Sequence, residues 1–245
     1  MEKEQQVGIT ETGEIAFNID AFNNLRRANI IITKRLTDAL IEKLIEHQDK
    51  IILHLTCTGM GGTVIEPFVP TTDEILRKFS TLIEKGFPIS HVVLRVDPII
   101  PTPKGVKTAL FVVKKFVNGF PELSRIRWSS IDMYEHVLAR FKEKGITPPF
   151  ETFSAAKVKI NALYSILEGI GYVNGIDIEA CGENGFNQPC ISQRDLDILG
   201  ITDIVLTGSA EQRSTCHCPA NKVQLIHDKP KRCANSCLYC YWKEN

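Results

Sequence analysis

Short runs of apolar, β-branched residues alternate along the chain with longer stretches in which apolar residues repeat at helical spacing. The six apolar runs are Asn29–Thr33, Ile51–Thr56, Val92–Val96, Ile126–Ser130, Ile176–Cys181 and Asp203–Leu206. The helical stretches are Asp38–His47, Thr72–Lys85, Lys104–Val117 and Ser154–Leu167. Because strands that are apolar on both faces are typical of a parallel sheet covered by helices, this alternation predicts an α/β fold of βα units.

Six such units fit either a doubly wound sheet or an open barrel. We expect the open barrel, a (β/α)6-type partial TIM barrel of mostly parallel strands, over residues 29–207. Residues 1–28 are predicted as an N-terminal extension, with a hairpin that turns at Glu11–Glu14 and a short helix at Ile19–Arg27. Residues 208–245 have little periodicity and are predicted as a cysteine-rich tail.

The charge balance and the hydropathy pattern narrow the class of protein. Lys+Arg and Asp+Glu each total 29, so no overall field attracts nucleic acid or an anionic membrane. No apolar run approaches the roughly 20 residues of a membrane helix, and the polar start MEKEQQVGIT is unlike a signal peptide. We therefore expect a cytoplasmic protein of ordinary globular composition.

The cysteines are unevenly distributed along the chain. Five of the eight lie in the last thirty residues: Cys216, Cys218, Cys233, Cys237 and Cys240. In a reducing compartment, such crowding favours metal ligation over disulfides. The tail is therefore predicted to be built around a metal centre.

Cys233, Cys237 and Cys240 have the spacing CxxxCxxC and are followed at once by Tyr241. Three thiolates can hold three irons of a [4Fe-4S] cluster and leave the fourth iron open. An open iron can chelate the amino and carboxylate groups of S-adenosylmethionine. Tyr241 would then lie against this cofactor or shield the cluster.

A structural zinc site is the alternative, because Cys216, His217 and Cys218 raise the number of potential ligands above the four that zinc requires. Cys216 and Cys218 have several possible roles of their own. They could bind a second cluster or metal, or reduce a substrate, with Cys218 as the candidate catalytic thiol. Equally, they could be small buried residues.

The CxxxCxxC spacing with its trailing aromatic residue resembles the motif of the radical S-adenosylmethionine superfamily. More of the chain resembles the family known as domain of unknown function 1848, whose members carry this cysteine cluster at the C-terminus. The matching segments are Thr33-Lys34, Leu55 to Gly61, Glu66-Pro67, Pro70, Arg95 to Ile99, Ile131 to Tyr134, Glu179 to Glu183, Cys190-Ile191, Cys216 to Cys218 and Cys233 to Trp242.

Members of that family usually begin with a further strand that ends in a Ser-Arg-Arg-Thr-Asp-like motif, which this chain lacks. Either residues 1–28 replace that unit, or the barrel is one unit smaller. The resemblance implies that a reduced cluster splits S-adenosylmethionine into methionine and a 5′-deoxyadenosyl radical, which abstracts hydrogen from a substrate. An electron donor such as flavodoxin or ferredoxin is then expected.

In a βα array, ligands bind where the strands end and the loops converge. A glycine-rich stretch follows the second predicted strand: Thr58, Gly59, Gly61 and Gly62. In the radical superfamily such a stretch holds the amino group of the cofactor, and the alternative is a tight turn. Glu66 could accept a hydrogen bond from the cofactor or the substrate, or it could be solvated.

Arg95 and Asp97 end the third predicted strand, and alternation places both side chains on one face. If that face lines the barrel, the two charges either pair with each other or bind ligand. In the second case Arg95 would hold a carboxylate or phosphate of the cofactor or substrate.

Further polar residues follow the fourth and fifth predicted strands. Asp132, Glu179 and Glu183 could bind ribose hydroxyls or an amino group, and Tyr134 could donate a proton or a hydrogen atom. For each of them, simple surface exposure is the alternative.

The expected substrate is a small amine, carboxylate or phosphate compound, or a nucleotide-linked one, and an isomerisation or rearrangement would need no further cofactor. The tail is expected to follow the sixth strand and to return over the mouth of the barrel. The alternative function is an iron–sulfur or zinc protein in which the tail has a structural or electron-transfer role.

Overall fold

The computed structural model describes residues 3–210, 215–227 and 233–242. Within them, seven parallel strands form one sheet with the order β6-β5-β4-β3-β2-β1-β7. The strands are β1 (Val7–Ile9), β2 (Ala28–Thr33), β3 (Ile51–Thr56), β4 (Val92–Ile99), β5 (Arg125–Ser130), β6 (Asp177–Ala180) and β7 (Lys222–Gln224). The strands β1 to β6 follow each other in sequence order, and β7 pairs with β1. This is the order of a barrel that stays open between β6 and β7, which confirms the open α/β fold.

Helices connect the strands. They are α1 (Asp38–Glu46), α2 (Thr72–Glu84), α3 (Pro103–Gly119), α4 (Glu135–Glu143), α5 (Lys157–Asn174) and α6 (Gln193–Ile198). Short 3-10 helices span Lys3–Gln5, Ile15–Phe17, Ile19–Asn24, Gln48–Lys50 and Ile89–His91. The start of α2 shows why the chain turns there, because Thr71 and Glu74 form a reciprocal capping box. No helix in the described ranges is long and apolar enough to cross a membrane.

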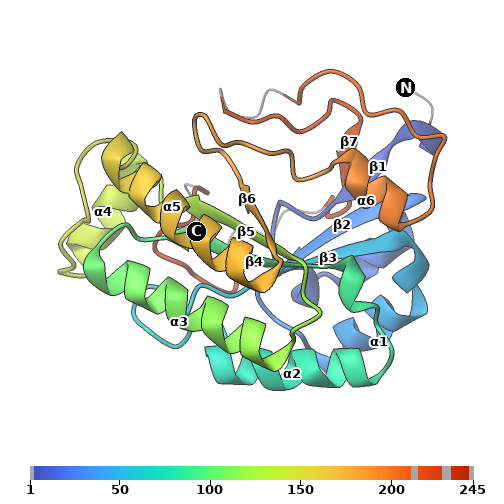
Figure 1. Ribbon diagram of the computed structural model, residues 1–245, viewed down its shortest axis with the longest axis horizontal. Helices are drawn as coiled ribbons and strands as arrows, with labels where there is room; N and C mark the ends of the chain where they lie inside the picture. Colours follow the sequence, from blue (N-terminus) through green and yellow to red (C-terminus); the bar gives the residue numbers. More distant parts are fainter. Residues whose placement is uncertain (1–2, 211–214, 228–232, 243–245) are drawn as a thin grey trace.

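The two faces of the sheet have different cover (Figure 1). On the outer face, Leu53 and Leu94 belong to a large apolar core that includes the buried sides of α1, α2, α3 and α5. On the inner face, Ile52 and Val93 pack with Leu196 of α6 and with the chain that leads to β7. Because side chains alternate along a strand, polar residues that share the inner face with Ile52 and Val93 point toward the barrel interior.

A third apolar cluster joins α4 to the C-terminal segment. Val137 and Phe141 of α4 pack there with Met60, Met133 and Leu238. Leu238 belongs to the cysteine motif, so this packing fixes the end of the chain near the C-terminal ends of the strands. The tail therefore lies at the mouth of the open barrel.

The edges of the sheet differ from the prediction. The first five apolar runs form β2 to β6, but Asp203–Leu206 is not a strand. Its backbone bonds to side chains instead: Val205 N–H donates to Gln5 Oε1 at 3.1 Å, and Asn221 Nδ2 donates to Val205 O at 3.1 Å. The position next to β1 is taken by β7.

The N-terminal segment also differs from the predicted hairpin. Val7–Ile9 pairs in parallel with β2 on one side and with β7 on the other, and Ile15–Phe17 is a 3-10 helix. Glu14 is not part of a hairpin turn. Its side chain accepts the N–H of Ala16 and caps that 3-10 helix. The first and last strands thus belong to the same sheet as the predicted barrel.

Candidate functional site

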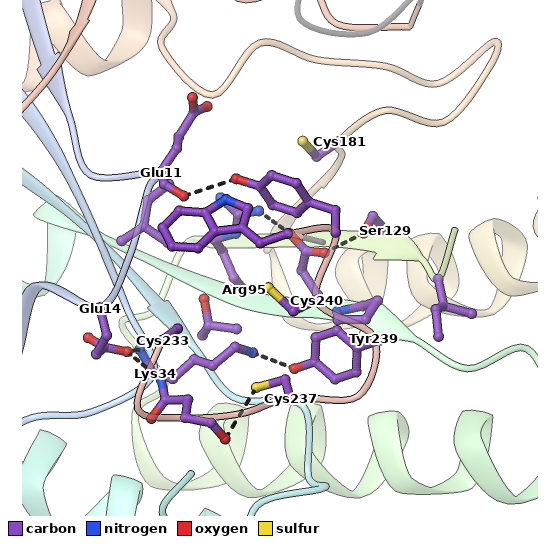
Figure 2. A pocket seen from close by; sticks show the side chains of 18 of the residues that line it. Glu11, Glu14, Lys34, Arg95, Ser129, Cys181, Cys233, Cys237, Tyr239 and Cys240 are labelled. Atoms are coloured by element: carbon purple, nitrogen blue, oxygen red, sulfur yellow. Dashed lines mark hydrogen bonds and ion pairs between the residues drawn. The ribbon is translucent and has the colours of Figure 1, made fainter. Parts of the chain in front are cut away.

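A cavity of about 440 Å³ opens at the C-terminal ends of the strands. One wall comes from the residues that follow the strands, among them Thr10, Lys34 and Thr56. The other wall is the terminal segment, from which the three cysteines of the CxxxCxxC motif face the cavity, as Figure 2 shows. The structure therefore brings the predicted metal ligands to the place where a βα fold binds its ligands.

A turn and two long-range contacts hold the cysteine motif in place. Cys240 N–H donates to Cys237 O at 3.1 Å, and Leu238 N–H donates to Ile65 O at 2.9 Å. Asn235, which is buried, donates from Nδ2 to Glu14 Oε2 at 3.0 Å. Because Glu14 also accepts the backbone N–H of Lys34, it connects the cysteine motif to the end of β2.

Lys34 connects the same motif to the end of β3. Its Nζ lies 3.1 Å from Glu66 Oε1 and donates to Tyr239 Oη at 2.7 Å. Glu66 also accepts hydrogen bonds from Tyr239 and from Thr58, the latter at 2.6 Å. Burial lowers the pKa of Lys34, but the attraction of Glu66 outweighs it, so the pKa is raised and the ammonium stays charged. A partly buried, paired cation thus lies beside Cys237.

The thiols of the motif are poor acids in this environment. Burial raises the pKa of Cys237 to about 12, and the nearby Lys34 only partly opposes this. Burial likewise raises the pKa of Cys233 and of Cys240. These cysteines are therefore protonated thiols at neutral pH until a metal displaces their protons.

The distances among the three thiols help to distinguish a single metal ion from an iron–sulfur cluster. In the described part of the chain, the group of ligand atoms that all lie within 4.8 Å of one another is Glu11, Cys190 and Cys218. The thiols of Cys233, Cys237 and Cys240 do not form such a close group, although they face the same cavity. A cluster separates its thiolates because each one binds a different iron, so this wider arrangement fits a cluster better than a single ion.

Arg95 and Asp97 line the cavity on the strand side and pair with each other. Asp97 also accepts a hydrogen bond from Ser129 at the end of β5. Burial raises the pKa of Asp97, but Arg95 and Ser129 outweigh it and hold the pKa below its usual range. The two charges are thus paired, as one alternative predicted, and they border the cavity; ligand binding by Arg95 stays a prediction.

Asp132 and Tyr134 also line the cavity. Asp132 accepts a hydrogen bond from Ser154 Oγ at 3.2 Å, and Tyr134 immediately precedes α4. The ring of Tyr134 lies 4.9 Å from that of Phe153 in an edge-to-face contact. Both residues are therefore held at the rim, where they can contact a ligand.

The glycine-rich turn lies beside the cavity and does not line it within the described residues. Gly59 (φ 78°) and Gly62 (φ 75°) adopt left-handed conformations. A Cβ on Gly61 would come within 2.0 Å of Pro70 O, so close backbone packing requires a glycine there. The turn positions Glu66, and its contact with a cofactor stays a prediction.

Glu179 and Glu183 lie at the end of β6 but behind the cavity wall. Glu179 accepts hydrogen bonds from Arg125 Nε at 2.9 Å and from Arg127 Nε at 3.0 Å, and Arg125 also reaches Asp195 of α6 at 2.7 Å. Burial raises the pKa of Glu179, but the two arginines outweigh this and lower it. Glu183 accepts the N–H of Ser130 at 2.5 Å. In this structure both carboxylates organise the strand ends.

Tyr241 lines the cavity, and its hydroxyl donates to Glu11 O at 3.1 Å. Cys218 is buried at 3% exposure and is not among the cavity-lining side chains described. Tyr241 therefore borders the cavity, whereas Cys218 does not border it.

Several residues that line the cavity were not predicted as site residues. They are Thr10, Glu14, Ser129, Asn235, Tyr239 and Trp242, together with Cys181 and Cys190. Glu14 was assigned to the predicted hairpin turn. No local pattern indicates its hydrogen bond with Asn235, which is 221 positions away. Tyr239 could have been predicted as a site residue, because it lies between two predicted metal ligands.

A family model described as domain of unknown function (DUF1848) matches residues 22–242. Comparison with curated proteins and with solved structures finds no match. The matched range includes every strand except β1 and contains the whole cysteine motif.

Proposed function

The chain belongs to the DUF1848 family, and we propose that it is a radical enzyme that binds a [4Fe-4S] cluster and S-adenosylmethionine in the strand-end cavity. One observation carries this proposal. The thiols of Cys233, Cys237 and Cys240 face the same cavity as the polar residues that end the parallel strands. A cluster held there would be next to a bound small molecule.

The donor set fits such a cluster. Three thiolates bind three irons, and the remaining iron stays open to the amino and carboxylate groups of S-adenosylmethionine. Lys34 lies near Cys237 and would offset part of the negative charge that the thiolates bring. Arg140 of α4 donates to Cys240 O at 2.6 Å and fixes the backbone on the other side of the motif.

When bound, a reduced cluster of this class supplies the electron that cleaves S-adenosylmethionine and yields a 5′-deoxyadenosyl radical. The protein's own residues bind, orient and exclude water. Arg95, Asp97 and Ser129 offer a polar strip at the strand ends for ligand hydroxyl, carboxylate or phosphate groups. Tyr241 and Trp242 form an aromatic cover on the side of the tail.

The substrate belongs to a class that these groups can recognise. The cavity is at the small end of ligand sites, which span about 300–1,000 Å³. A small compound with an amine, carboxylate or phosphate, or a nucleotide-linked one, suits Arg95 and Asp132. Tyr134 at the rim is the candidate donor of a proton or a hydrogen atom, and flavodoxin or ferredoxin is the proposed electron source.

Cleavage of S-adenosylmethionine without added substrate is the direct test. Anaerobically reconstituted protein is reduced and incubated with S-adenosylmethionine, and 5′-deoxyadenosine is measured by liquid chromatography. We expect product from the wild type and at least a hundredfold less from Cys237→Ala. Cys57→Ala is the matched control, because Cys57 is a buried thiol in the outer-face core.

An intact cluster that gives no 5′-deoxyadenosine would overturn the enzyme proposal. It would favour the alternative, an iron–sulfur protein whose tail has an electron-transfer role. Stoichiometric zinc at Cys233, Cys237 and Cys240, with no iron after anaerobic purification, would favour a structural tail.

A further inference from the structure

Three cysteines outside the CxxxCxxC motif meet inside the open barrel. Cys181 follows β6, Cys190 precedes α6, and Cys218 lies in the segment that leads to β7. Cys181 Sγ and Cys190 Sγ are 3.6 Å apart, and the Cys190 N–H donates to Cys218 Sγ at 3.2 Å. All three are buried, with 9%, 4% and 3% of their surface exposed. Cys190 thus contacts two cysteines that come from two other loops.

This group is distinct from the terminal motif. Its members pack with Ile52 and Val93 on the inner face of the sheet, whereas Leu238 of the motif packs with α4. Cys181 and Cys190 border the same cavity as the terminal cysteines, and Figure 2 shows Cys181 well apart from Cys233 and Cys237. One cavity therefore lies between two sets of thiols.

The distances fit ligands that share one metal atom. Thiolates about 2.3 Å from a tetrahedral metal ion are about 3.8 Å from each other. The contact of 3.6 Å between Cys181 and Cys190 is close to this value. A carboxylate oxygen of Glu11 and the sulfur atoms of Cys190 and Cys218 also all lie within 4.8 Å of one another. Glu11, Cys190 and Cys218 thus form one close group, and Cys181 adjoins it through Cys190.

Two buried arginines near these cysteines favour a negative charge there. Arg95 Nε and Arg127 Nη1 are buried and have no hydrogen-bond partner among the described residues. Both arginines act electrostatically on the thiol of Cys190. Unpartnered buried donors next to a thiol are costly unless an anion lies nearby. A thiolate centre supplies that anion.

We infer that Cys181, Cys190 and Cys218 are ligands of a second metal centre, separate from the site of Cys233, Cys237 and Cys240. Its ligand class is a thiophilic metal, either a single zinc ion or the iron of a second cluster, because both take tetrahedral thiolate coordination. Glu11 or Cys216 completes the set, since Cys216 is partly buried against the same apolar cluster. This site does not depend on the radical function.

Metal analysis of the full chain tests the inference after the first site has been removed. In Cys233→Ala/Cys237→Ala/Cys240→Ala, we expect bound metal to remain after purification and desalting. Zinc near one equivalent identifies a single ion, and iron together with sulfide identifies a cluster. Adding Cys190→Ala should lower the bound metal at least tenfold, whereas adding Cys57→Ala should leave it unchanged.

A spectroscopic measurement avoids dependence on the folding of the Cys190 variant. Cobalt(II) added to the metal-free triple variant should give sulfur-to-cobalt charge-transfer absorbance and the strong visible bands of tetrahedral coordination. A folded triple variant that binds no zinc, iron or cobalt would overturn the inference. So would a Cys181–Cys190 disulfide found by mass spectrometry in metal-free protein isolated without air.

Discussion

Lys34 contributes a partly buried positive charge to the cysteine motif, although it is 199 positions away in sequence from Cys233. It contacts Glu66 at 3.1 Å and Tyr239 Oη at 2.7 Å, and its ammonium lies 5.3 Å from the centre of the Tyr239 ring. Partners that orient metal ligands commonly change metal affinity 10- to 100-fold when they are removed. Lys34 is therefore expected to control how firmly the motif holds iron.

The variant Lys34→Met should lose iron to a chelator at least about tenfold faster than the wild type. The reason is that Glu66 loses its cationic partner and Tyr239 loses a hydrogen-bond donor. The measurement is the decay of cluster absorbance after addition of a chelator. Lys78→Met is the control, because Lys78 pairs with Asp38 on the surface. An unchanged rate in a folded Lys34→Met protein would contradict this role.

Asp97 makes a pH-dependent contribution at the same edge of the sheet. Its folded-state pKa lies below the usual value, so the carboxylate stabilises the fold above the unfolded-state pKa of about 3.9, and this contribution is lost as the pH falls through the folded-state value. Asp97→Asn should lower the free energy of unfolding by about 3 kcal/mol at pH 7, because Arg95 is left without its buried partner.

Urea denaturation at pH 7 and below pH 4 measures this contribution. The difference between the wild type and Asp97→Asn should shrink in acid, where the wild-type carboxyl also becomes protonated. Asp203→Asn serves as the control, because Asp203 pairs with Arg27 on the surface and should change stability little at either pH. A difference that stays constant with pH would contradict the assignment.

At the scale of elements, the turn between β3 and α2 is built by close packing. It presents Ile65 O to the N–H of Leu238 and orients Glu66 toward Lys34. The turn depends on Gly61, since a Cβ there would meet the backbone of Pro70 and could not be relieved by a side-chain rotation. A local feature of one connection thus supports the cysteine motif at the far end of the chain.

Gly61→Ala should lower the free energy of unfolding by about 1–3 kcal/mol, because the turn must shift to relieve the clash. Gly169→Ala is the matched control: Gly169 is inside α5, with no atom within 4 Å of the added Cβ. That change should stabilise the protein by about 0.5–1 kcal/mol. Chemical denaturation of both variants measures the contrast, and equal effects would show that packing at Gly61 is unimportant.

For some of the helices, the local pattern of apolar residues is sufficient to predict the helix from the sequence. Clear apolar periodicity predicted α1, α2 and α3 nearly to their ends, whereas α4 and α6 were missed. The six residues of α6 are too few to show a period, and two of its buried positions are Asp195 and Leu196. The buried carboxylate of Asp195 is paired with Arg125 of β5 at 2.7 Å, a contact that no local pattern indicates.

At the scale of the whole molecule, the two ends of the chain complete one sheet. The strand β1 lies between β2 and β7, and Glu14 just after it binds Asn235. The N-terminal region is thus part of the barrel and part of the support for the cysteine motif. Removing it would expose the edge of β2 and leave β7 without a partner.

Deletion of residues 1–18 should therefore abolish cooperative unfolding and iron retention together. Size-exclusion chromatography and urea denaturation measure the first effect, and iron content measures the second. The single variant Glu14→Gln separates the two roles, because it keeps β1: unfolding should stay cooperative while iron retention weakens. A truncated chain that still unfolds cooperatively and binds iron would contradict the structural role of β1.

The sequence alone determined the features that depend on near neighbours. Apolar runs predicted the buried central strands, because a strand covered on both faces is rich in apolar residues. The spacing of Cys233, Cys237 and Cys240 predicted a metal motif within eight residues.

Only the tertiary structure decided which strands form the edges and which distant side chains meet. The three-residue strands β1 and β7 carry almost no pattern of their own and are strands because they pair with each other. Cys181 and Cys218 meet Cys190 for a similar reason, since packing of separate loops sets distances that no local spacing encodes.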